Sequence, residues 1–332
     1  MTPRYSCALP PGADVVEKAR LAERLGYHRV WVFESPAVYG DTWIALARVA
    51  EATERIGLAT GVAIPGLRHP MVTASAVASV EELAPGRLVV AFGTGYTGRS
   101  TLGQKPVTWA ELAVYVRQVR ALLRGEVVEI DGRPCQMMHL PGFAPDRPIG
   151  VPVWVAASGP RGFGVAQELG VPGVVVTAVP EDGNQGWAEF ALLRFGTVLE
   201  PGEDHTSPRV AEAAGPGYAS TVHAVWEHGK EAVDSLPGGA RWRAALEADR
   251  QEGLRHLVAH RGHLSSLTDR DRGLVAAAGP AFLRVGWSGD AASIGERIGE
   301  SAATGVTEIV YVPAGPDVER ELHAFAAAAA RS

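Results

Sequence analysis

Short apolar runs alternate with longer amphipathic segments along most of the chain. Runs rich in β-branched residues predict buried strands, whereas apolar residues at every third or fourth position predict helices. This strand–helix order repeats with little interruption, which predicts parallel strands joined by crossover helices. The expected strands lie at residues 5–9, 28–34, 56–64, 87–93, 151–158, 171–179, 190–200 and 306–315.

Helices are expected between most of these strands. Asp41 and Thr108 are suited to cap two of them, because their side-chain oxygens can accept hydrogen bonds from the first free N–H groups. Gly26 and Pro85-Gly86 end two others. The expected helices lie at residues 14–26, 41–54, 70–86, 108–125, 159–170 and 290–305.

Two segments depart from this repeat. Residues 126–140 carry Asp131-Gly132 between two short strands, the pattern of a two-residue hairpin, and we expect them to lie outside the barrel. Residues from about 202 to 279 have a helical pattern without a strand. Eight strands in this order predict a TIM (β/α)8 barrel in a single domain over residues 1–332, with a helical insertion before the last strand.

The composition excludes several classes of partner. The formal net charge of the 332-residue chain is -6, which disfavours a nucleic-acid binder. No apolar run approaches the length of a membrane span, and the first residues lack the apolar core of a signal peptide. Cys7 and Cys135 form neither a metal-type spacing nor a disulfide framework. We therefore expect a cytoplasmic protein with reduced thiols that binds neither nucleic acid nor membranes.

The carboxyl ends of the expected strands carry the candidate chemistry, because barrel enzymes place their active sites there. Glu34 ends an otherwise apolar strand, where a carboxyl group with a raised pKa can act as an acid or base, or can instead hold a neighbouring loop. The fourth strand ends in Gly93-Thr94-Gly95-Tyr96, where the glycines permit either a turn or close approach of the backbone to a ligand.

The stretch AASGPRG, at residues 156–162, has the pattern of an anion site. Ser158 offers a hydroxyl, Gly159 and Gly162 leave N–H groups free at the start of a helix, and Arg161 adds a cation. An ordinary turn capped by serine is the alternative. No Gly-Lys-Ser/Thr follows, so the stretch is not a Walker A loop, and the glycine spacing is not that of a dinucleotide fingerprint.

Three histidines lie close together in the expected insertion: His256, His260 and His263. His256 and His260 are one helical turn apart, as in some metal sites, but Leu257 stands where a metalloprotease carries glutamate. We therefore expect no metal site. His260 and His263 are candidates for polar residues of the pocket, and a solvated helix end is the alternative.

Residues 60–95, TGVAIPGLRHPMVTASAVASVEELAPGRLVVAFGTG, resemble the central signature of the bacterial luciferase-like flavin and deazaflavin oxidoreductases. The resemblance extends from about residue 4 to residue 177 and returns at the last strand. It implies a TIM-like barrel that holds a flavin-type ring at the strand ends, with a cis peptide bond at Gly61-Val62. It also implies that AASGPRG is the phosphate loop of this family. The implied cofactor-binding residues are Ser35, Thr60, Gly61, Val62, Gly93, Thr94, Gly95, Tyr96, Ser158, Gly159, Pro160, Arg161, Gly162 and Thr177.

The resemblance leaves three functions to compare. The first is a reductase that uses coenzyme F420 to transfer a hydride to a C=C or C=N bond, with Glu34, Tyr96, His260 or His263 as the proton donor. The second is a monooxygenase that uses reduced FMN and oxygen, supplied by a separate reductase. The third is a barrel without a cofactor that serves as a binding protein, which the glycines and the phosphate loop disfavour.

One difference from the family pattern narrows the range of reactions that the resemblance implies. Deazaflavin-dependent members that act on alcohols or sugar phosphates carry Asp-His at the end of the second strand, and this chain has Glu34-Ser35 there. Serine cannot replace histidine as a proton acceptor, so alcohol oxidation is disfavoured.

The substrate is expected to be a small molecule. The resemblance also implies a homodimer built from the early barrel helices.

Overall fold

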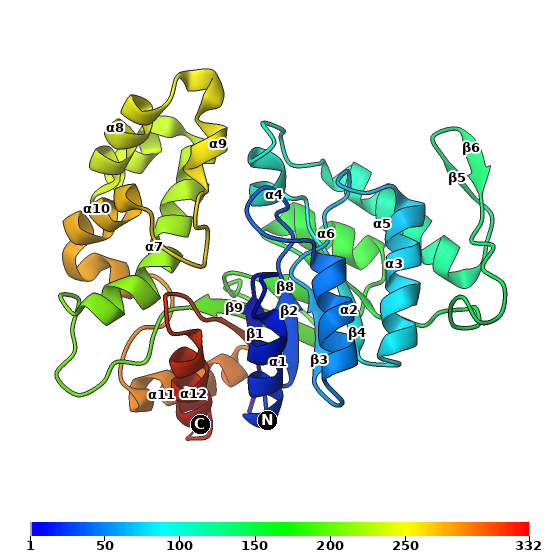
Figure 1. Ribbon diagram of the computed structural model, residues 1–332, viewed down its shortest axis with the longest axis horizontal. Helices are drawn as coiled ribbons and strands as arrows, with labels where there is room; N and C mark the ends of the chain where they lie inside the picture. The colour runs from blue at the N-terminus through cyan, green and yellow to red at the C-terminus, as the bar shows by residue number, and fades with distance from the viewer. Residues whose placement is uncertain (1, 332) are drawn as a thin grey trace.

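The computed structural model describes residues 2–331 and contains a closed barrel of eight parallel strands (Figure 1). Neighbouring strands follow the order β1-β10-β9-β8-β7-β4-β3-β2, so the first strand pairs with the last and closes the barrel. The predicted barrel and its eight strands are confirmed. The strands are β1 (Arg4–Leu9), β2 (Arg29–Val32), β3 (Gly57–Thr60), β4 (Leu88–Phe92), β7 (Val153–Ala156), β8 (Gly173–Val176), β9 (Glu189–Phe195) and β10 (Glu308–Val312).

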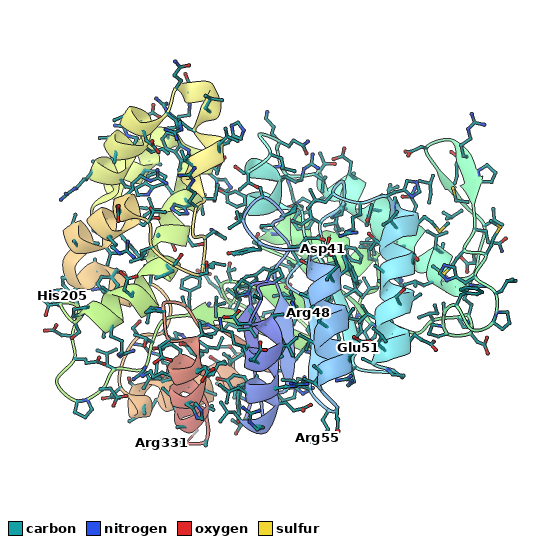
Figure 2. The ribbon with its side chains drawn as sticks, in the orientation of Figure 1. Asp41, Arg48, Glu51, Arg55, His205 and Arg331 are labelled. Atoms are coloured by element: carbon teal, nitrogen blue, oxygen red, sulfur yellow. The ribbon has the colours of Figure 1, made fainter. Side chains whose placement is uncertain are left out.

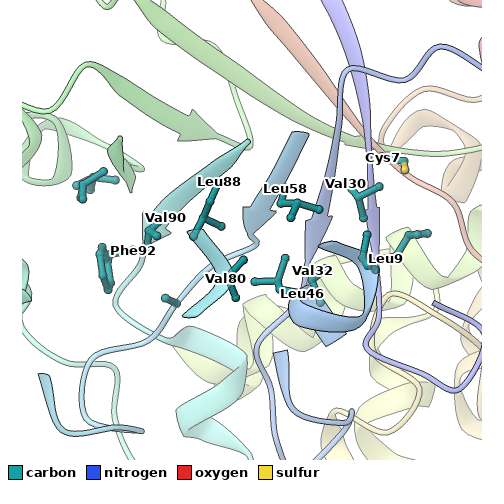
Figure 3. Close-up of a cluster of buried hydrophobic side chains, with 14 of the residues drawn as sticks. Cys7, Leu9, Val30, Val32, Leu46, Leu58, Val80, Leu88, Val90 and Phe92 are labelled. Carbon is teal, nitrogen blue, oxygen red and sulfur yellow. The ribbon is translucent and has the colours of Figure 1, made fainter. Parts of the chain in front are cut away.

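Successive strand residues alternate between the barrel interior and the layer under the helices, as the pleat of a strand requires. Trp31 and Trp154 fill the interior with their rings, whose centroids are 5.7 Å apart. Figure 3 shows side chains of the outer layer, where alternate residues of β1 to β4 meet the helices. Residues labelled there include Leu9, Val30, Val32, Leu58, Leu88, Val90 and Phe92.

A buried ion pair lies inside the barrel near the start of the strands. Glu308 is fully buried and pairs with the guanidinium of Arg29. Trp31 donates its indole N–H to the other carboxylate oxygen of Glu308, at 2.8 Å. Burial is the largest single effect and would raise the pKa of Glu308, but the charge of Arg29, the hydrogen bond from Trp31 and further contributions together shift this pKa downward.

Helices cover the outside of the barrel. Asp41 accepts hydrogen bonds from the N–H groups of Trp43 and Ile44, and Thr108 forms a capping box with Glu111, so both predicted caps are confirmed. Figure 2 shows Arg48 and Glu51 pointing outward from α2, with Asp41 at one end of that helix and Arg55 beyond the other. These helices are α1 (Val15–Arg24), α2 (Thr42–Ala52), α3 (Pro70–Leu83), α5 (Trp109–Arg124), α6 (Pro160–Glu168), α11 (Ala291–Ala303) and α12 (Val318–Ala329).

The predicted hairpin is present and projects away from the barrel (Figure 1). Its strands, β5 (Val128–Ile130) and β6 (Arg133–Cys135), are joined by Asp131 and Gly132. Both turn residues have positive φ angles, 50° and 71°, as a type I′ turn requires.

The part of the chain between β9 and α11 forms a separate group of helices, which packs around its own apolar core (Figure 1). Its α-helices are α7 (Pro208–His228), α8 (Gly239–Asp249), α9 (His256–Ala259) and α10 (Asp269–Ala278). Three 3-10 helices accompany them, at Lys230–Ser235, Glu252–Leu254 and Gly279–Arg284. Trp226, Trp242 and Phe282 are buried at its centre. We refer to residues 208–284 as the insertion.

The glycine-rich segment after β4 leads directly into helical structure. Residues Tyr96–Ser100 form a short helix, α4, with Gly95 in the left-handed conformation at its start.

Among the described residues, no helix combines the length and the apolar character that a membrane span needs. Cys7 and Cys135 are both free thiols.

Candidate functional site

Three adjoining hollows occupy the carboxyl ends of the barrel strands. They enclose about 260, 220 and 520 Å³, and Ser158 lines all three. They therefore form one path from the barrel mouth, past the ends of β3 and β7, to the start of α6. Lining residues of the first hollow include Phe33, Glu34, Ser35, Tyr39, Gly61, Val62, Gly93, Thr94, Gly95, Tyr96, Leu193, His263 and Leu264.

Glu34 supplies the only carboxyl group among the described residues that line the first hollow. It lies two residues beyond β2 and is 8% exposed. Its Oε2 accepts a hydrogen bond from the Ile64 N–H at 2.5 Å, and its Oε1 lies 3.8 Å from Nε of Arg68. Two contacts thus fix the orientation of the carboxyl group at the edge of the hollow.

Burial raises the pKa of Glu34 from 4.5 to about 7. The hydrogen bond from Ile64 and the charge of Arg68 oppose this shift, and they are outweighed. Arg68 is less effective because its guanidinium also pairs with Asp41. A carboxyl group with a pKa near 7 can hold or release a proton under physiological conditions.

The glycines that follow β4 make room for the end of β3. The Gly61-Val62 peptide bond is cis, as the resemblance implies. A methyl group on Gly93 would lie 2.5 Å from Cγ2 of Val62, and one on Gly95 would lie 2.3 Å from Cγ2 of Ile64. Gly95 also has a φ of 82°, which favours glycine. These glycines therefore let the two strand ends meet beneath the hollow.

Two of the expected cofactor residues have their hydroxyl groups engaged elsewhere. Thr60 does not line the hollows, because its Oγ1 donates to the Ala91 carbonyl at 2.8 Å and accepts from the Ala91 N–H at 2.9 Å. Tyr96 lines the first hollow, but its hydroxyl donates to the Ala224 carbonyl at 2.5 Å and its ring stacks on His228. Burial also raises the pKa of Tyr96 above its usual value. The Tyr96 hydroxyl thus ties α4 to α7.

The start of α6 has the features of an anion site. No side chain caps this helix, so its first N–H groups are left for a ligand. Gly159, at φ 78° and ψ 172°, adopts a conformation essentially limited to glycine. Ser158, Gly159, Pro160 and Thr177 line the third hollow. Gly162 packs against Trp109 instead, and Arg161 is exposed outside the hollow.

The two candidate histidines of the insertion have different positions. His263 is half-buried and lines the first hollow beside Leu264, and its Nε2 lies 3.2 Å from Oγ1 of Thr97. Burial lowers the pKa of His263 well below its usual value, which favours the neutral ring. His260 is buried outside the hollow, with its Nε2 3.0 Å from Oε1 of Glu227. Only His263 therefore faces the candidate site.

Several residues of the site are not among those predicted from the sequence. Tyr39 lines the first hollow and donates its hydroxyl to the His263 carbonyl, which holds the insertion against the barrel. Leu193 and Leu264 supply apolar walls, and Leu264 has a φ of 57°, rare for a residue other than glycine. The position of Tyr39 in the loop after a strand is a signal that could have indicated it.

The chain is similar in sequence to one protein family and to several individual proteins. The family described as luciferase-like monooxygenase matches residues 2–308. A 5,10-methylenetetrahydromethanopterin reductase of Archaeoglobus fulgidus is 26% identical over 91% of this chain and 90% of that protein. An F420-dependent glucose-6-phosphate dehydrogenase of Beutenbergia cavernae is 32% identical over 47% of this chain. The chain aligns with about half the length of that dehydrogenase and of the reductase of Methanolobus tindarius.

Solved structures share the fold at low sequence identity. An F420-dependent secondary alcohol dehydrogenase in complex with an F420-acetone adduct superposes with a TM-score of 0.65 at 17% identity, over 98% of both chains. The F420-dependent tetrahydromethanopterin reductase of Methanopyrus kandleri has the same TM-score and coverage at 18% identity. The FMN complex of a Baeyer-Villiger monooxygenase of Pseudomonas putida superposes with a TM-score of 0.59 at 14% identity, over 98% of this chain and 97% of that chain.

Proposed function

Because this chain belongs to the luciferase-like monooxygenase family, we propose that it is an oxidoreductase that binds coenzyme F420 and reduces a C=C or C=N bond of a small organic substrate. Two kinds of relative support this proposal. The reductase of Archaeoglobus fulgidus aligns over nearly the full length of this chain and supports a reduction. Further relatives are named as F420-dependent dehydrogenases and support the choice of F420.

The residues of the site fit a flavin-type group with a phosphate on its side chain. The glycines at 93 and 95 lie where a methyl group would clash, so the floor of the hollow is bare backbone. The uncapped start of α6 offers N–H groups for an anion at the far end of the same path. Residues proposed to contact the cofactor are Ser35, Gly61, Val62, Gly93, Thr94, Gly95, Tyr96, Ser158, Gly159, Pro160 and Thr177.

The buried Glu34 carboxyl group is the observation that carries the proposal of a reduction. When bound, F420 supplies hydride chemistry, and the reduced bond then needs one proton. Glu34 faces the hollow, is held by the Ile64 N–H, and has a pKa of about 7, so it can retain a proton and deliver it. Ser35 beside it adds no titratable group, which leaves Glu34 as the proposed donor. His263 lines the same hollow but is held neutral by burial.

A monooxygenase that uses reduced FMN is the second candidate. The family description and the FMN complex among the similar structures favour it. The α6 site does not distinguish the two cofactors, because both carry a ribityl phosphate. This function would need a separate reductase to supply the reduced flavin.

Cofactor titration of the purified full-length chain separates these functions. We expect F420 to bind at least tenfold more tightly than FMN, and reduced F420 to be oxidised without oxygen when a C=C or C=N substrate is supplied. Glu34→Gln should lower turnover about a hundredfold or more and leave the affinity for F420 nearly unchanged. Tighter binding of FMN together with oxygen-dependent product formation would establish the monooxygenase instead.

We also infer that the chain forms a homodimer through the early barrel helices. α2 and α3 pack side by side, and each presents an exposed aliphatic side chain, Ile44 and Val72, which are 65% and 48% exposed. Sedimentation at micromolar concentration should give twice the 35.0 kDa mass of the chain. Val72→Asp should shift the mass to that of the monomer, and an unmodified protein that sediments as a monomer would rule out this assembly.

A further inference from the structure

Three histidines from separate segments meet where the insertion contacts the barrel. His223 lies in α7, His260 directly follows α9, and His263 lies in the loop before α10. One ring nitrogen of each lies within 4.8 Å of one from each of the others. The ring centroids form a triangle with sides of 5.4, 5.7 and 6.2 Å. We call these three residues the histidine cluster.

Each ring has one nitrogen engaged outside the cluster. His223 Nε2 lies 3.2 Å from Oδ1 of Asp271, and His260 Nε2 lies 3.0 Å from Oε1 of Glu227. A carboxylate only accepts hydrogen bonds, so the Nε2 atoms of His223 and His260 carry the protons and their Nδ1 atoms carry lone pairs. Asp271 is itself held by the Trp242 indole N–H, at 2.8 Å.

The other ring nitrogens have no partner. Nδ1 of His223, His260 and His263 are all buried and without a hydrogen bond within the described residues. A buried nitrogen without a hydrogen bond is unfavourable, because it has lost its contact with water and gained no partner in exchange. His223 and His260 are both 1% exposed, so bulk water does not reach them. Three buried, unpartnered nitrogens on rings that approach one another this closely suit an occupant that accepts electron pairs.

We propose that the histidine cluster binds one divalent transition-metal ion of the zinc class. Imidazole nitrogens suit zinc and its neighbours, whereas calcium and magnesium prefer oxygen ligands. Histidine ligands whose second nitrogen donates to a carboxylate are typical of such sites. The two carboxylates, Asp271 and Glu227, also balance the double charge of the ion. Three protein ligands leave a further coordination position for water or another molecule.

The ion would join two separate segments of the site. A tetrahedral ion about 2.0–2.1 Å from each nitrogen sets the nitrogens about 3.3 Å apart, so binding draws the loop of His260 and His263 toward α7. That loop carries the His263 carbonyl that accepts from Tyr39, and the Leu264 side chain that lines the first hollow. Metal binding therefore orders one wall of the candidate active site.

The experiment uses the full-length protein without cofactor, stripped with a chelator and titrated with Zn2+. We expect one equivalent per chain. His223→Gln and His260→Gln should each weaken Zn2+ binding at least a hundredfold, because glutamine can keep the outer hydrogen bond but lacks the inner nitrogen. His256→Gln is the matched control, one turn before His260 and outside the cluster, and should bind Zn2+ within threefold of the unmodified protein.

A second measurement does not depend on the folding of the variants. The unmodified protein loaded with Co2+ should give the intense visible absorption of a four-coordinate ion, without the charge-transfer band of a thiolate ligand. A thiolate band, binding of no Zn2+, or unchanged affinity in both His223→Gln and His260→Gln would overturn the proposal. The affinity for F420 is measured separately, so a metal site without F420 binding would refute the proposed function and leave this inference standing.

Discussion

Glu34 and Ile64 are joined at the mouth of the barrel by one hydrogen bond, from the Ile64 N–H to Oε2 of Glu34 at 2.5 Å. This bond links the end of β2 to the segment after the cis Gly61-Val62 bond, and so connects the candidate proton donor to the backbone that forms the floor of the hollow. One N–H group does not offset the loss of water around the carboxylate, and the pKa of Glu34 stays near 7.

The raised pKa of Glu34 predicts a specific pH dependence of stability. The folded state holds this proton more tightly than the unfolded state, so the contribution of Glu34 is fully present below pH 4.5 and is lost as the pH rises to about 7. The loss amounts to about 3 kcal/mol in the free energy of unfolding. Urea unfolding between pH 4.5 and 8 should show this decline, and Glu34→Gln should remove it. Replacing the exposed Glu82 by glutamine should leave the decline in place.

The close approach of Gly93 to Val62 predicts that substitutions at these two positions are coupled in their effect on stability. Gly93→Ala places a methyl group 2.5 Å from Cγ2 of Val62 and should cost about 2 kcal/mol of stability. Adding Val62→Ala removes the clashing carbon and should recover more than half of that loss. Chemical denaturation of the two single variants and the double variant measures the coupling. Purely additive losses would mean that Gly93 is needed for another reason.

The start of α6 predicts a selective loss of phosphate binding. Gly159→Val forces a side chain into a conformation essentially limited to glycine and should weaken binding of F420 or FMN at least tenfold, while riboflavin, which lacks the phosphate, binds as before. Gly170→Val, just beyond the other end of this helix, is the matched control because Gly170 also has a positive φ and open space around it. Equal weakening of riboflavin binding would place the phosphate elsewhere.

The buried pair of Arg29 and Glu308 predicts a large stability effect. Glu308→Gln leaves the Arg29 charge without its partner inside the barrel and should cost about 3–5 kcal/mol. The exposed pair of Arg4 and Glu189 lies at the same end of the barrel, and Glu189→Gln should cost less than about 1 kcal/mol. Guanidinium unfolding of both variants gives the comparison. Similar, small losses of stability in both variants would show that water solvates the Arg29 guanidinium once Glu308 has been replaced.

The Tyr96 hydroxyl predicts a structural rather than a chemical effect. Tyr96→Phe removes the hydrogen bond to the Ala224 carbonyl and should cost about 1 kcal/mol of stability. Hydrogen exchange at α4 and the adjoining turn of α7 should become faster, because this bond joins the two helices. Turnover should fall far less than in Glu34→Gln. A hundredfold loss of turnover with unchanged exchange would instead make Tyr96 the proton donor.

Several features of the fold and of the site follow from local sequence alone. Asp131-Gly132 specified its hairpin because both positions need positive φ, which few residue pairs tolerate. The position of Glu34 at the end of an apolar strand was sufficient to predict a carboxyl group at the barrel mouth. The eight strands were predictable because each is an apolar run bounded by turn residues, a pattern that depends only on neighbours in the chain.

Other features depend on segments that are distant in sequence. The spacing of His256 and His260 suggests a pair on one helix, but α9 ends at Ala259, and His260 instead meets His223, which lies 37 positions earlier. No local pattern indicates that Tyr39 and Tyr96 hold the insertion against the barrel.

Local sequence therefore determined the strands, the turns and the placement of Glu34, because backbone preferences and apolar periodicity act over a few residues. Tertiary structure alone decided the pKa of Glu34 and the assembly of the histidine cluster. Desolvation and side-chain contacts of this kind arise only when packing brings remote segments together.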